Sequence, residues 1–345
     1  MMDRTHNIPG RNPNFAYLAS CFFTRIGHHT SVVIATVLLS PAFFSCQRAA
    51  LPPGMEESPV QIYILRSKKT TPGGLDLFFF HDDALMLLDS YQHIEDGGEA
   101  HVQGIAGGSA HRLVAFSNLP ASSFQWSDIR SAPALNSVSF SLENDSPVAP
   151  FLYGQCPLEE GRSRSCVLRL KTALCEIELH SLSCDFRGKA YEGAPFLLER
   201  VFLTWANSLC QPLSEETLLS YLNPGYLDET PRFRYPEMLC RSIGQEVGAA
   251  RTTLETCLYC YPNPVTAAEM GRMPTHLVLE GSLDGHRCYY PIPLPALSAD
   301  THYAIDLTLT RLGSPEPDIP VESGTFILET DTQKWNHAED LLVRF

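Results

Sequence analysis

Apolar and polar residues alternate with a period of two in several segments of the chain, and this pattern constrains the fold more than any other feature. His302–Thr310 reads HYAIDLTLT and places a tyrosine, an isoleucine and two leucines at every second position. Cys175–Ser181 follows the same rule. Because successive side chains of a β-strand point to opposite faces of a sheet, each segment predicts a strand with one buried face.

A tight hairpin is predicted in the last third of the chain. Thr275–Leu283 and His286–Ile292 are rich in apolar residues and are separated only by Asp284-Gly285. This dipeptide suits a two-residue turn in which both backbones need positive φ. The other segments with strand character are Val60–Leu65, Leu75–Phe80, Arg112–Ser117, Val201–Trp205, Thr325–Thr330 and Leu341–Phe345.

Helical signals are confined to two short segments. Ser214–Leu222 begins with a capping serine followed by two glutamates, and Pro236–Val247 has a proline that suits a first helical position. The chain also contains 26 prolines and 22 glycines, which are typical turn residues. We therefore predict an all-β chain built of β-sandwiches, with the two helices as minor insertions.

A polar stretch without alternation, residues 154–165, is the expected linker between two domains. It separates an N-terminal β-sandwich domain, residues 58–153, from a C-terminal β-sandwich domain, residues 166–345. The combined length is sufficient for two ordinary domains.

The N-terminal region has the features of an export signal. Ser31–Cys46 reads SVVIATVLLSPAFFSC, which is shorter than the roughly 20 apolar residues that span a bilayer, and Arg25 precedes it. Residues 1–45 are expected to be a signal peptide with an N-terminal extension. Cys46 would then carry a lipid, and residues 46–57 would be the lipidated tether. The alternative is that Cys46 is only a small residue after an ordinary signal.

The charge balance bears on the partners of the chain. The formal net charge is −14, and no basic cluster offsets it. Because such a chain repels phosphate backbones, we expect it to bind no nucleic acid.

Nine cysteines follow Cys46, an odd number that would leave at least one thiol free if disulfides form. Cys257 and Cys260 form a CxxC pair, but no second pair and no histidine pair accompanies them. We therefore expect no metal or redox site, and interpret most of the thiols as small buried hydrophobes. The nine are Cys156, Cys166, Cys175, Cys184, Cys210, Cys240, Cys257, Cys260 and Cys288.

Catalytic motifs are missing from the sequence, which lacks a GxSxG elbow, an HExxH pair, a P-loop and a dinucleotide fingerprint. Gly107–His111 has the composition of an elbow but predicts a turn, and so does His81–Asp83, whose side chains could otherwise hold a cation. Trp126, Trp205 and Trp335 are too far apart in sequence to locate a sugar-binding platform. We predict no catalytic residues, no cofactor and no metal, hence no enzyme.

A family resemblance is carried by the strand sequences themselves. The N-terminal part contributes LDLFFFHDDALMLLDSYQHI and HRLVAFSNLP. The C-terminal part contributes LKTALCEIELHSLSCDF, LYCYPNP, HLVLEGSLDGHRCYYPIPL and HYAIDLTLTRLGSPEPDIPVESGTF. In this order they span most of the chain and resemble the Bacteroidia fimbrillins, the FimA/Mfa-like pilus subunits.

The resemblance implies two β-sandwich domains of the transthyretin-like, fimbrillin type in a lipoprotein precursor that is exported to the outer membrane and the cell surface. Such subunits build a fimbrium by donor-strand exchange with other fimbrial subunits. An arginine-specific protease cuts after an early strand, that strand leaves, and a strand of the next subunit fills the groove. Stalk, tip and anchor subunits are not distinguished.

The family mechanism can be carried onto particular residues of this sequence. Val60, Ile62 and Ile64 would belong to the strand that leaves, and Arg66 would be the cleaved arginine, the alternative being an ordinary exposed loop charge. The donor strand would contain Phe326, Leu328 and Leu342.

Two other functions stay open at this level. One is a non-polymerising surface lipoprotein that binds glycans or other host ligands. The other is a secreted hydrolase whose site is scattered over loops.

Overall fold

The computed structural model describes residues 57–66, 73–95, 98–119, 126–159, 164–222, 235–269, 271–322 and 324–334. These residues belong to one compact unit. The expected signal peptide, Cys46, Trp335 and the segment Leu341–Phe345 with Leu342 lie outside the described residues.

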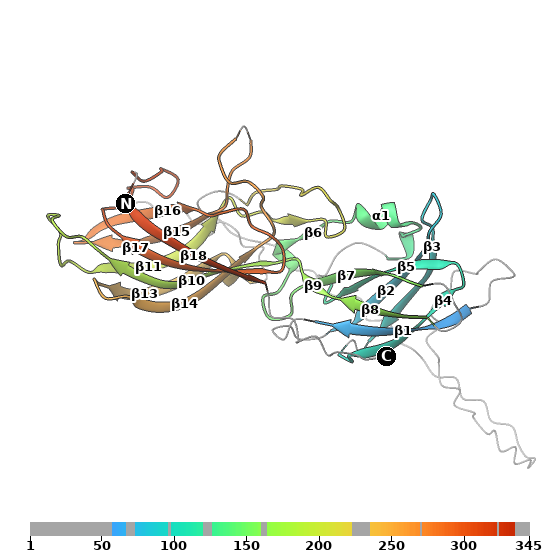
Figure 1. Cartoon of the computed structure of the whole chain (residues 1–345). Helices are drawn as coiled ribbons and strands as arrows, with labels where there is room; N and C mark the ends of the chain where they lie inside the picture. The colour runs from blue at the N-terminus through green and yellow to red at the C-terminus, as the bar shows by residue number, and fades with distance from the viewer. Residues whose placement is uncertain are drawn as a thin grey trace, which may run out of the picture. The chain divides into compact units, whose positions relative to one another are not determined.

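The first sandwich is made by the strands up to Thr172 (Figure 1). One sheet has the order β4 (His101–Gly107), β1 (Glu57–Leu65) and β8 (Arg164–Arg169). The other has the order β3 (Leu88–Ile94), β2 (Leu75–His81), β5 (Ala110–Ser117), β7 (Leu152–Pro157) and β9 (Lys171–Thr172). β1 is antiparallel to β4 and parallel to β8, and all pairs of the five-stranded sheet are antiparallel.

The core of this sandwich explains the unbroken apolar run in β2. Leu75, Leu77 and Phe79 point toward the three-stranded sheet and pack in its core cluster. Phe78 and Phe80 point the other way into a second cluster, which continues into the C-terminal strands. Because both faces of β2 are covered, its sequence shows no alternation.

The second sandwich is made by the strands from Cys175 onward. One sheet has the order β14 (Thr252–Cys260), β10 (Cys175–Cys184), β17 (Thr301–Leu309) and β18 (Phe326–Lys334). The other has the order β13 (Cys240–Val247), β11 (Phe196–Thr204), β15 (His276–Leu283) and β16 (His286–Pro293). Among the described strands of this sandwich, β10 and β17 pair in parallel and the other pairs are antiparallel.

The remaining elements are short. They are α1 (Ala132–Asn136), the 3₁₀ turns η1 (Trp126–Asp128), η2 (Leu142–Asn144) and η4 (Pro236–Met238), and the two-residue strands β6 (Phe140–Ser141) and β12 (Leu209–Cys210), which pair with each other. None of the helices in the described ranges has the length and apolar character needed to cross a membrane.

The predicted all-β class and the strands that lie within the described residues are confirmed. The hairpin of β15 and β16 turns at Asp284 and Gly285, whose φ angles are 51° and 77°. Both are positive, as the turn requires.

The first predicted helix, Ser214–Leu222, is wrong, since this segment has a bend and an isolated β-bridge at Tyr221 but no helix. Its backbone groups bond to other parts of the chain instead. The Asn207 side chain donates to the carbonyls of Leu209 and Leu218 and accepts from the amide of Ser220. These tertiary hydrogen bonds override a weak helix propensity.

The second predicted helix, Pro236–Val247, is also wrong beyond its first turn. η4 covers its first three residues, and β13 then runs along β11 from Cys240 to Val247. A proline can start a 3₁₀ turn as well as an α-helix. Pro236 therefore marks the start of a helical turn but does not predict its length.

The expected linker is corrected as well. Residues 154–165 contain the end of β7 and the start of β8, and β8 pairs with β1 at the beginning of the chain. The sheets change from the first sandwich to the second between Thr172 and Cys175. The polar residues of this segment therefore belong to the connection between β7 and β8 within the first sandwich, and not to a linker between domains.

Candidate functional site: the first strand and its groove

The first strand occupies the middle of its sheet. Residues 57–63 of β1 pair with β4, and residues 60–65 pair with β8. A central strand is held by two ladders of backbone hydrogen bonds, so its loss would leave two facing rows of unpaired N–H and C=O groups. The gap between β4 and β8 would be a groove of the width of one strand.

The inner face of β1 is buried in the core of the first sandwich. Val60 and Ile62 are 0% exposed and Ile64 is 5% exposed, while the residues between them are half-buried. These three side chains share a cluster with Leu77 and Phe79 of β2. The structure therefore brings together the three residues that the sequence assigned to the leaving strand.

A buried arginine lies at one end of this groove. Arg164, the first residue of β8, is 1% exposed, and its Nη2 donates to Oγ of Ser58 at 2.7 Å. The same nitrogen donates to the carbonyls of Ala106 and Gly107, each at 2.9 Å, and Nη1 donates to the carbonyl of Ala110 at 3.0 Å. One guanidinium thus ties β8 to β1 and to the turn between β4 and β5.

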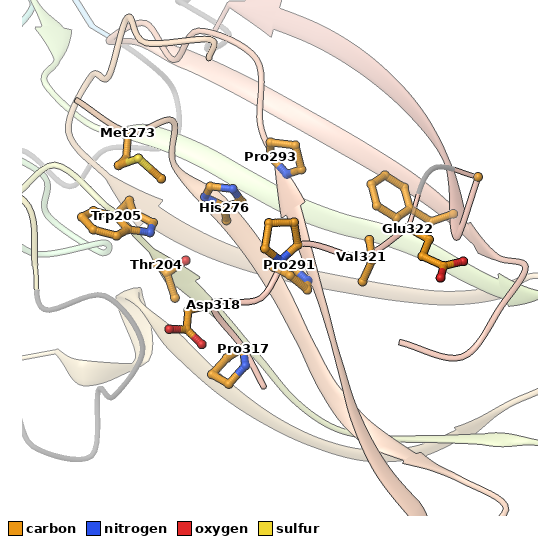
Figure 2. A pocket seen from close by; sticks show the side chains of 13 residues that line it. Thr204, Trp205, Met273, His276, Pro291, Pro293, Pro317, Asp318, Val321 and Glu322 are labelled. Carbon is orange, nitrogen blue, oxygen red and sulfur yellow. The ribbon is translucent and has the colours of Figure 1, made fainter. Parts of the chain in front are cut away.

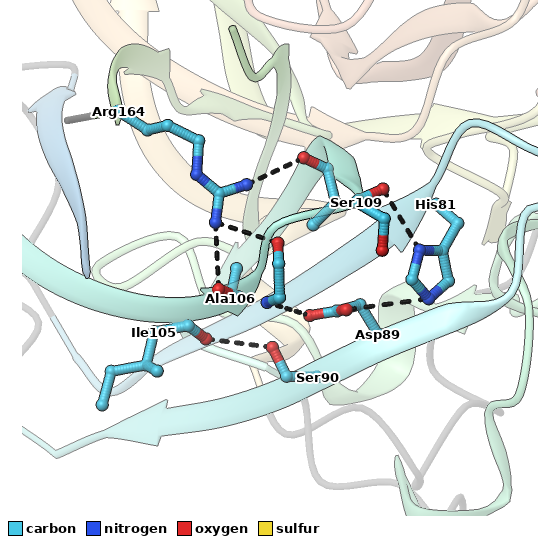
Figure 3. Close-up of polar contacts among 9 residues, drawn as sticks. His81, Asp89, Ser90, Ile105, Ala106, Ser109 and Arg164 are labelled. Carbon is cyan, nitrogen blue, oxygen red and sulfur yellow. Dashed lines mark hydrogen bonds and ion pairs between the residues drawn. The ribbon is translucent and has the colours of Figure 1, made fainter. Parts of the chain in front are cut away.

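A buried carboxylate and a half-buried imidazole support the same turn. Oδ2 of Asp89 accepts the amide of Gly107 at 2.7 Å, and Nε2 of His81 lies 3.6 Å from Oδ1 of Asp89. Nδ1 of His81 donates to the carbonyl of Ser109 at 3.1 Å (Figure 3). Burial lowers the pKa of Arg164, and the Asp89 charge opposes that effect.

Sequence reasoning missed Arg164 as a groove residue and placed it in a linker. The signal was present in the alternation of β8, RSCVLR, which puts Arg164 on the same face as Cys166 and Leu168. A buried arginine on an apolar face needs several acceptors, and the carbonyls at the strand ends supply them.

Arg66 directly follows β1 and is half-buried rather than fully exposed. Its Nη1 donates to the carbonyl of Glu99 at 3.4 Å, and burial lowers its pKa. Residues 67–72, which include the rest of the expected cleavage loop, lie outside the described residues.

The candidate donor strand β18 is bound less extensively than β1. It pairs along its whole length with β17, at the edge of its sheet. Phe326 and Leu328 pack partly against the core, whereas Ile327 is 55% exposed. Burial along β18 falls off after Leu328, since the residues from Glu329 onward are exposed.

The other motifs form no common site. Cys257 and Cys260 are three positions apart on β14, so they point to opposite faces of the sheet, and only Cys260 is fully buried. Asp83 caps its own turn by accepting the amide of Leu85, and Gly108 and Ser109 form the predicted turn. Within the described ranges, no three His, Cys, Asp or Glu side chains are grouped to hold a metal ion.

A pocket of about 390 Å³ lies on the second sandwich (Figure 2). β11, β15 and β16 supply Thr204, His276 and Pro291 to it, and the connection before β18 supplies Asp318 and Glu322. Burial lowers the pKa of His276.

Trp205 lines one end of this pocket, with its edge against Tyr221. Its φ of 55° is unusual for a bulky residue. Trp126, by contrast, packs against Phe78 and Phe116. The two described tryptophans therefore form no common aromatic platform.

The sequence matches no protein-family model and no curated protein. Solved structures are similar. A candidate cell adhesion protein from Bacteroides eggerthii has a TM-score of 0.64 at 14% identity, over 81% of this chain and 96% of the other. A fimbrilin (FimA) from Porphyromonas gingivalis W83 has a TM-score of 0.57 at 14% identity, over 81% and 97%. The tip fimbrial protein Mfa3 from Porphyromonas gingivalis has a TM-score of 0.51 at 8% identity, over 81% and 100%.

These similarities define the class of the fold, which is that of two-sandwich fimbrial and cell adhesion proteins. In particular, the chain has the fold of the Bacteroidia fimbrillins, as the strand sequences indicated. The structures that it resembles are fimbrial and adhesion proteins and not enzymes.

Proposed function

We propose that the chain is a structural subunit of a cell-surface fimbrium and assembles with other subunits by donor-strand exchange. The observation that carries this proposal is the position of β1. The first described strand is the middle strand of its sheet, packs three apolar side chains into the core and is followed at once by Arg66. A strand placed in this way can be cut from the chain and replaced by another strand.

The energetics favour replacement over an empty groove. Each of Val60, Ile62 and Ile64 contributes about 1.5–3 kcal/mol by burial, and each ladder hydrogen bond adds about 1 kcal/mol. A donor strand with apolar residues at alternate positions would restore both contributions. A donor strand bound in this way would dissociate from the groove very slowly.

β18 and the chain after it are the proposed donor. β18 has a single neighbouring strand in the described part of the chain, so it leaves its sheet more easily than β1 does. Phe326 and Leu328 would supply apolar side chains, and Leu342 would extend the series.

We further propose that the chain is exported as a lipoprotein precursor. Cys46 would carry the lipid and hold the subunit on the outer membrane at the cell surface. The two sandwiches would be separate domains that meet between Thr172 and Cys175.

The alternative is a non-polymerising lipoprotein that binds glycans or another host ligand. It would use the pocket in Figure 2, which is lined by Trp205, His276, Asp318 and Glu322. The resemblance to fimbrial proteins does not favour this alternative. We therefore propose assembly into a fimbrium as the function.

Treatment of the folded full chain with an arginine-specific protease tests the assembly function. We expect a cut after Arg66, release of β1 and formation of oligomers that withstand mild denaturant. Because Arg66 is half-buried, cleavage should follow local opening at the end of β1. Arg66→Lys keeps the charge and should abolish both cleavage and oligomers.

Two outcomes would contradict the proposal. One is cleavage at Arg162 alone, and the other is a cut product that stays monomeric when mixed with intact subunits. Cys46→Ala tests the anchor separately, since the variant should leave the membrane fraction or keep its signal peptide.

A further inference from the structure

Two cysteines of the first sandwich lie against each other across its two sheets. Cys156 is on β7 in the five-stranded sheet, and Cys166 is on β8 in the three-stranded sheet. Each is 8% exposed, and both belong to the same core cluster. Their thiols are within hydrogen-bonding reach of each other.

The backbones of β7 and β8 also approach closely. A Cβ built on Gly154 would stand 2.3 Å from the carbonyl oxygen of Arg169, so only glycine fits there. Cys156 is two residues from Gly154 and Cys166 is three residues from Arg169. The close approach of the two backbones therefore lies in the stretch of β7 and β8 that carries the two cysteines.

β8 is weakly held apart from this contact. Among the described residues, its only strand partner is β1. When β1 leaves, β8 loses its whole ladder, and the groove loses one wall unless another link holds it. Arg164 supplies one such link through hydrogen bonds, and the cysteines can supply a covalent one.

We propose that Cys156 and Cys166 are oxidised to a disulfide in the exported protein, which ties β8 to β7 across the sandwich. The bond itself rests on the proposed export but not on the assembly function. Its role of holding the groove wall while β1 is absent rests on the proposed donor-strand exchange.

The chemistry is a thiol–disulfide exchange with an acceptor disulfide, either of a small molecule or of an oxidoreductase. Hydrogen bonding from Cys156 lowers the pKa of Cys166. The thiolate of one cysteine bonds to one acceptor sulfur and expels the other. The second cysteine then attacks the sulfur of the first and expels the second acceptor thiolate, so the acceptor gains two electrons and the two protons of the cysteines.

A second cysteine pair serves as an internal control. Cys175 and Cys260 are directly opposite each other on β10 and β14, and both are 0% exposed. Burial raises the pKa of Cys175 well above its usual value. Oxidation of the folded protein should therefore reach Cys156 and Cys166 but leave this pair as thiols.

Peptide mapping of the full-length protein isolated from cells tests the bond. The protein is denatured in the presence of an alkylating reagent that blocks all free thiols, and the chain is then digested with trypsin without reduction. Because Arg162 and Arg164 lie between the two cysteines, peptides 131–162 and 165–169 should elute joined and separate on reduction. Cys156→Ser should abolish the joined peptide and leave Cys166 alkylated. Alkylation of both cysteines in the wild type before any reduction would overturn the proposal.

Limited trypsin digestion tests the role in the groove. After cleavage at Arg66 and removal of β1, Arg164 should stay protected from trypsin in the oxidised protein and be cut at least tenfold faster after reduction, because β8 can then leave the sandwich. Equal protection in both states would refute the role while leaving the peptide result intact. A failure to oligomerise would refute the assembly function but would not affect the joined peptide.

Discussion

The first described strand and the last one, β1 and β18, are both candidates for exchange, yet the fold holds them very differently. β1 lies between two neighbours and buries three aliphatic side chains almost completely. β18 lies at a sheet edge, and only Phe326 and Leu328 contact the core. The same alternating sequence pattern therefore describes a strand whose loss opens a groove and a strand whose loss costs little. The alternating pattern specifies which residues face inward, whereas the number of neighbouring strands decides how much the sheet loses when the strand is removed.

Replacing one isoleucine on each strand by aspartate should give the largest contrast. Ile62→Asp buries an unpaired carboxylate in the core, which we expect to cost more than about 5 kcal/mol and to leave the protein unfolded. Ile327→Asp changes a side chain that is 55% exposed and should cost less than about 1 kcal/mol. Urea denaturation followed by tryptophan fluorescence measures both. Equal losses would show that β18 is part of the core in solution.

Local patterns predicted the strands and the turn between β15 and β16, because period-two alternation and Asp284-Gly285 act within a few residues. They failed where distant groups decide the structure. The Ser214–Leu222 segment has helix signals, but Asn207 and its neighbours take its backbone groups. β13 likewise became a strand because β11 offers it a ladder.

Arg164→Met tests whether the end of the groove depends on one buried charge. The variant leaves the carbonyls of Ala106, Gly107 and Ala110 without this donor and Asp89 without its nearby cation. We expect a loss of about 3–5 kcal/mol in the free energy of unfolding. Arg164→Lys, which keeps the charge but not the fork of donors, should recover only part of it. A loss below about 1 kcal/mol for Arg164→Met would mean that water replaces the guanidinium.

The candidate site was predictable in part. The pattern of residues 60–65 predicted a strand, the family resemblance assigned Val60, Ile62 and Ile64 to a leaving strand, and the structure buries all three. The central position of β1 was not predictable, since its parallel partner β8 lies about a hundred residues further along the chain and no local signal reports such pairing. The role of Arg164 follows from that pairing and was missed with it.

Asp145 links the two sandwiches through a side-chain hydrogen bond to Tyr261, and its titration tests how the stability of the protein depends on this buried carboxyl group. Its carboxylate accepts the amides of Ser146 and Phe151 and the hydroxyl of Tyr261 at 3.0 Å. Burial nevertheless raises its pKa to about 6 from an ordinary value of 3.8. The folded state therefore holds this proton more tightly, so the contribution of Asp145 to stability is complete below about pH 4 and is lost as the pH rises through 6.

The expected size of this effect is about 3 kcal/mol, at about 1.4 kcal/mol for each pH unit between the two values. Asp145→Asn removes the titration, so the difference in unfolding free energy between wild type and variant should change by about that amount between pH 4 and pH 7.5. Tyr261→Phe removes a hydrogen bond that lowers the pKa, and should shift the midpoint to higher pH. A difference that is constant over this pH range would contradict the raised pKa.

The smallest expected effect concerns the inner face of β18. Leu328 packs partly against the core, so Leu328→Ala should cost about 1 kcal/mol, less than the 2–5 kcal/mol that is typical of a fully buried leucine. Thr330→Ala, two positions further along the same exposed edge strand, is the matched control and should be neutral within about 0.5 kcal/mol. Hydrogen exchange should show the amides of residues 326–334 opening before those of β17, with the gap widening in Leu328→Ala, because β18 can separate from its single neighbour without unfolding the sandwich. If β18 instead exchanges together with β17 in both proteins, it is too firmly held to serve as a donor, and the donor strand must lie in the chain that follows it.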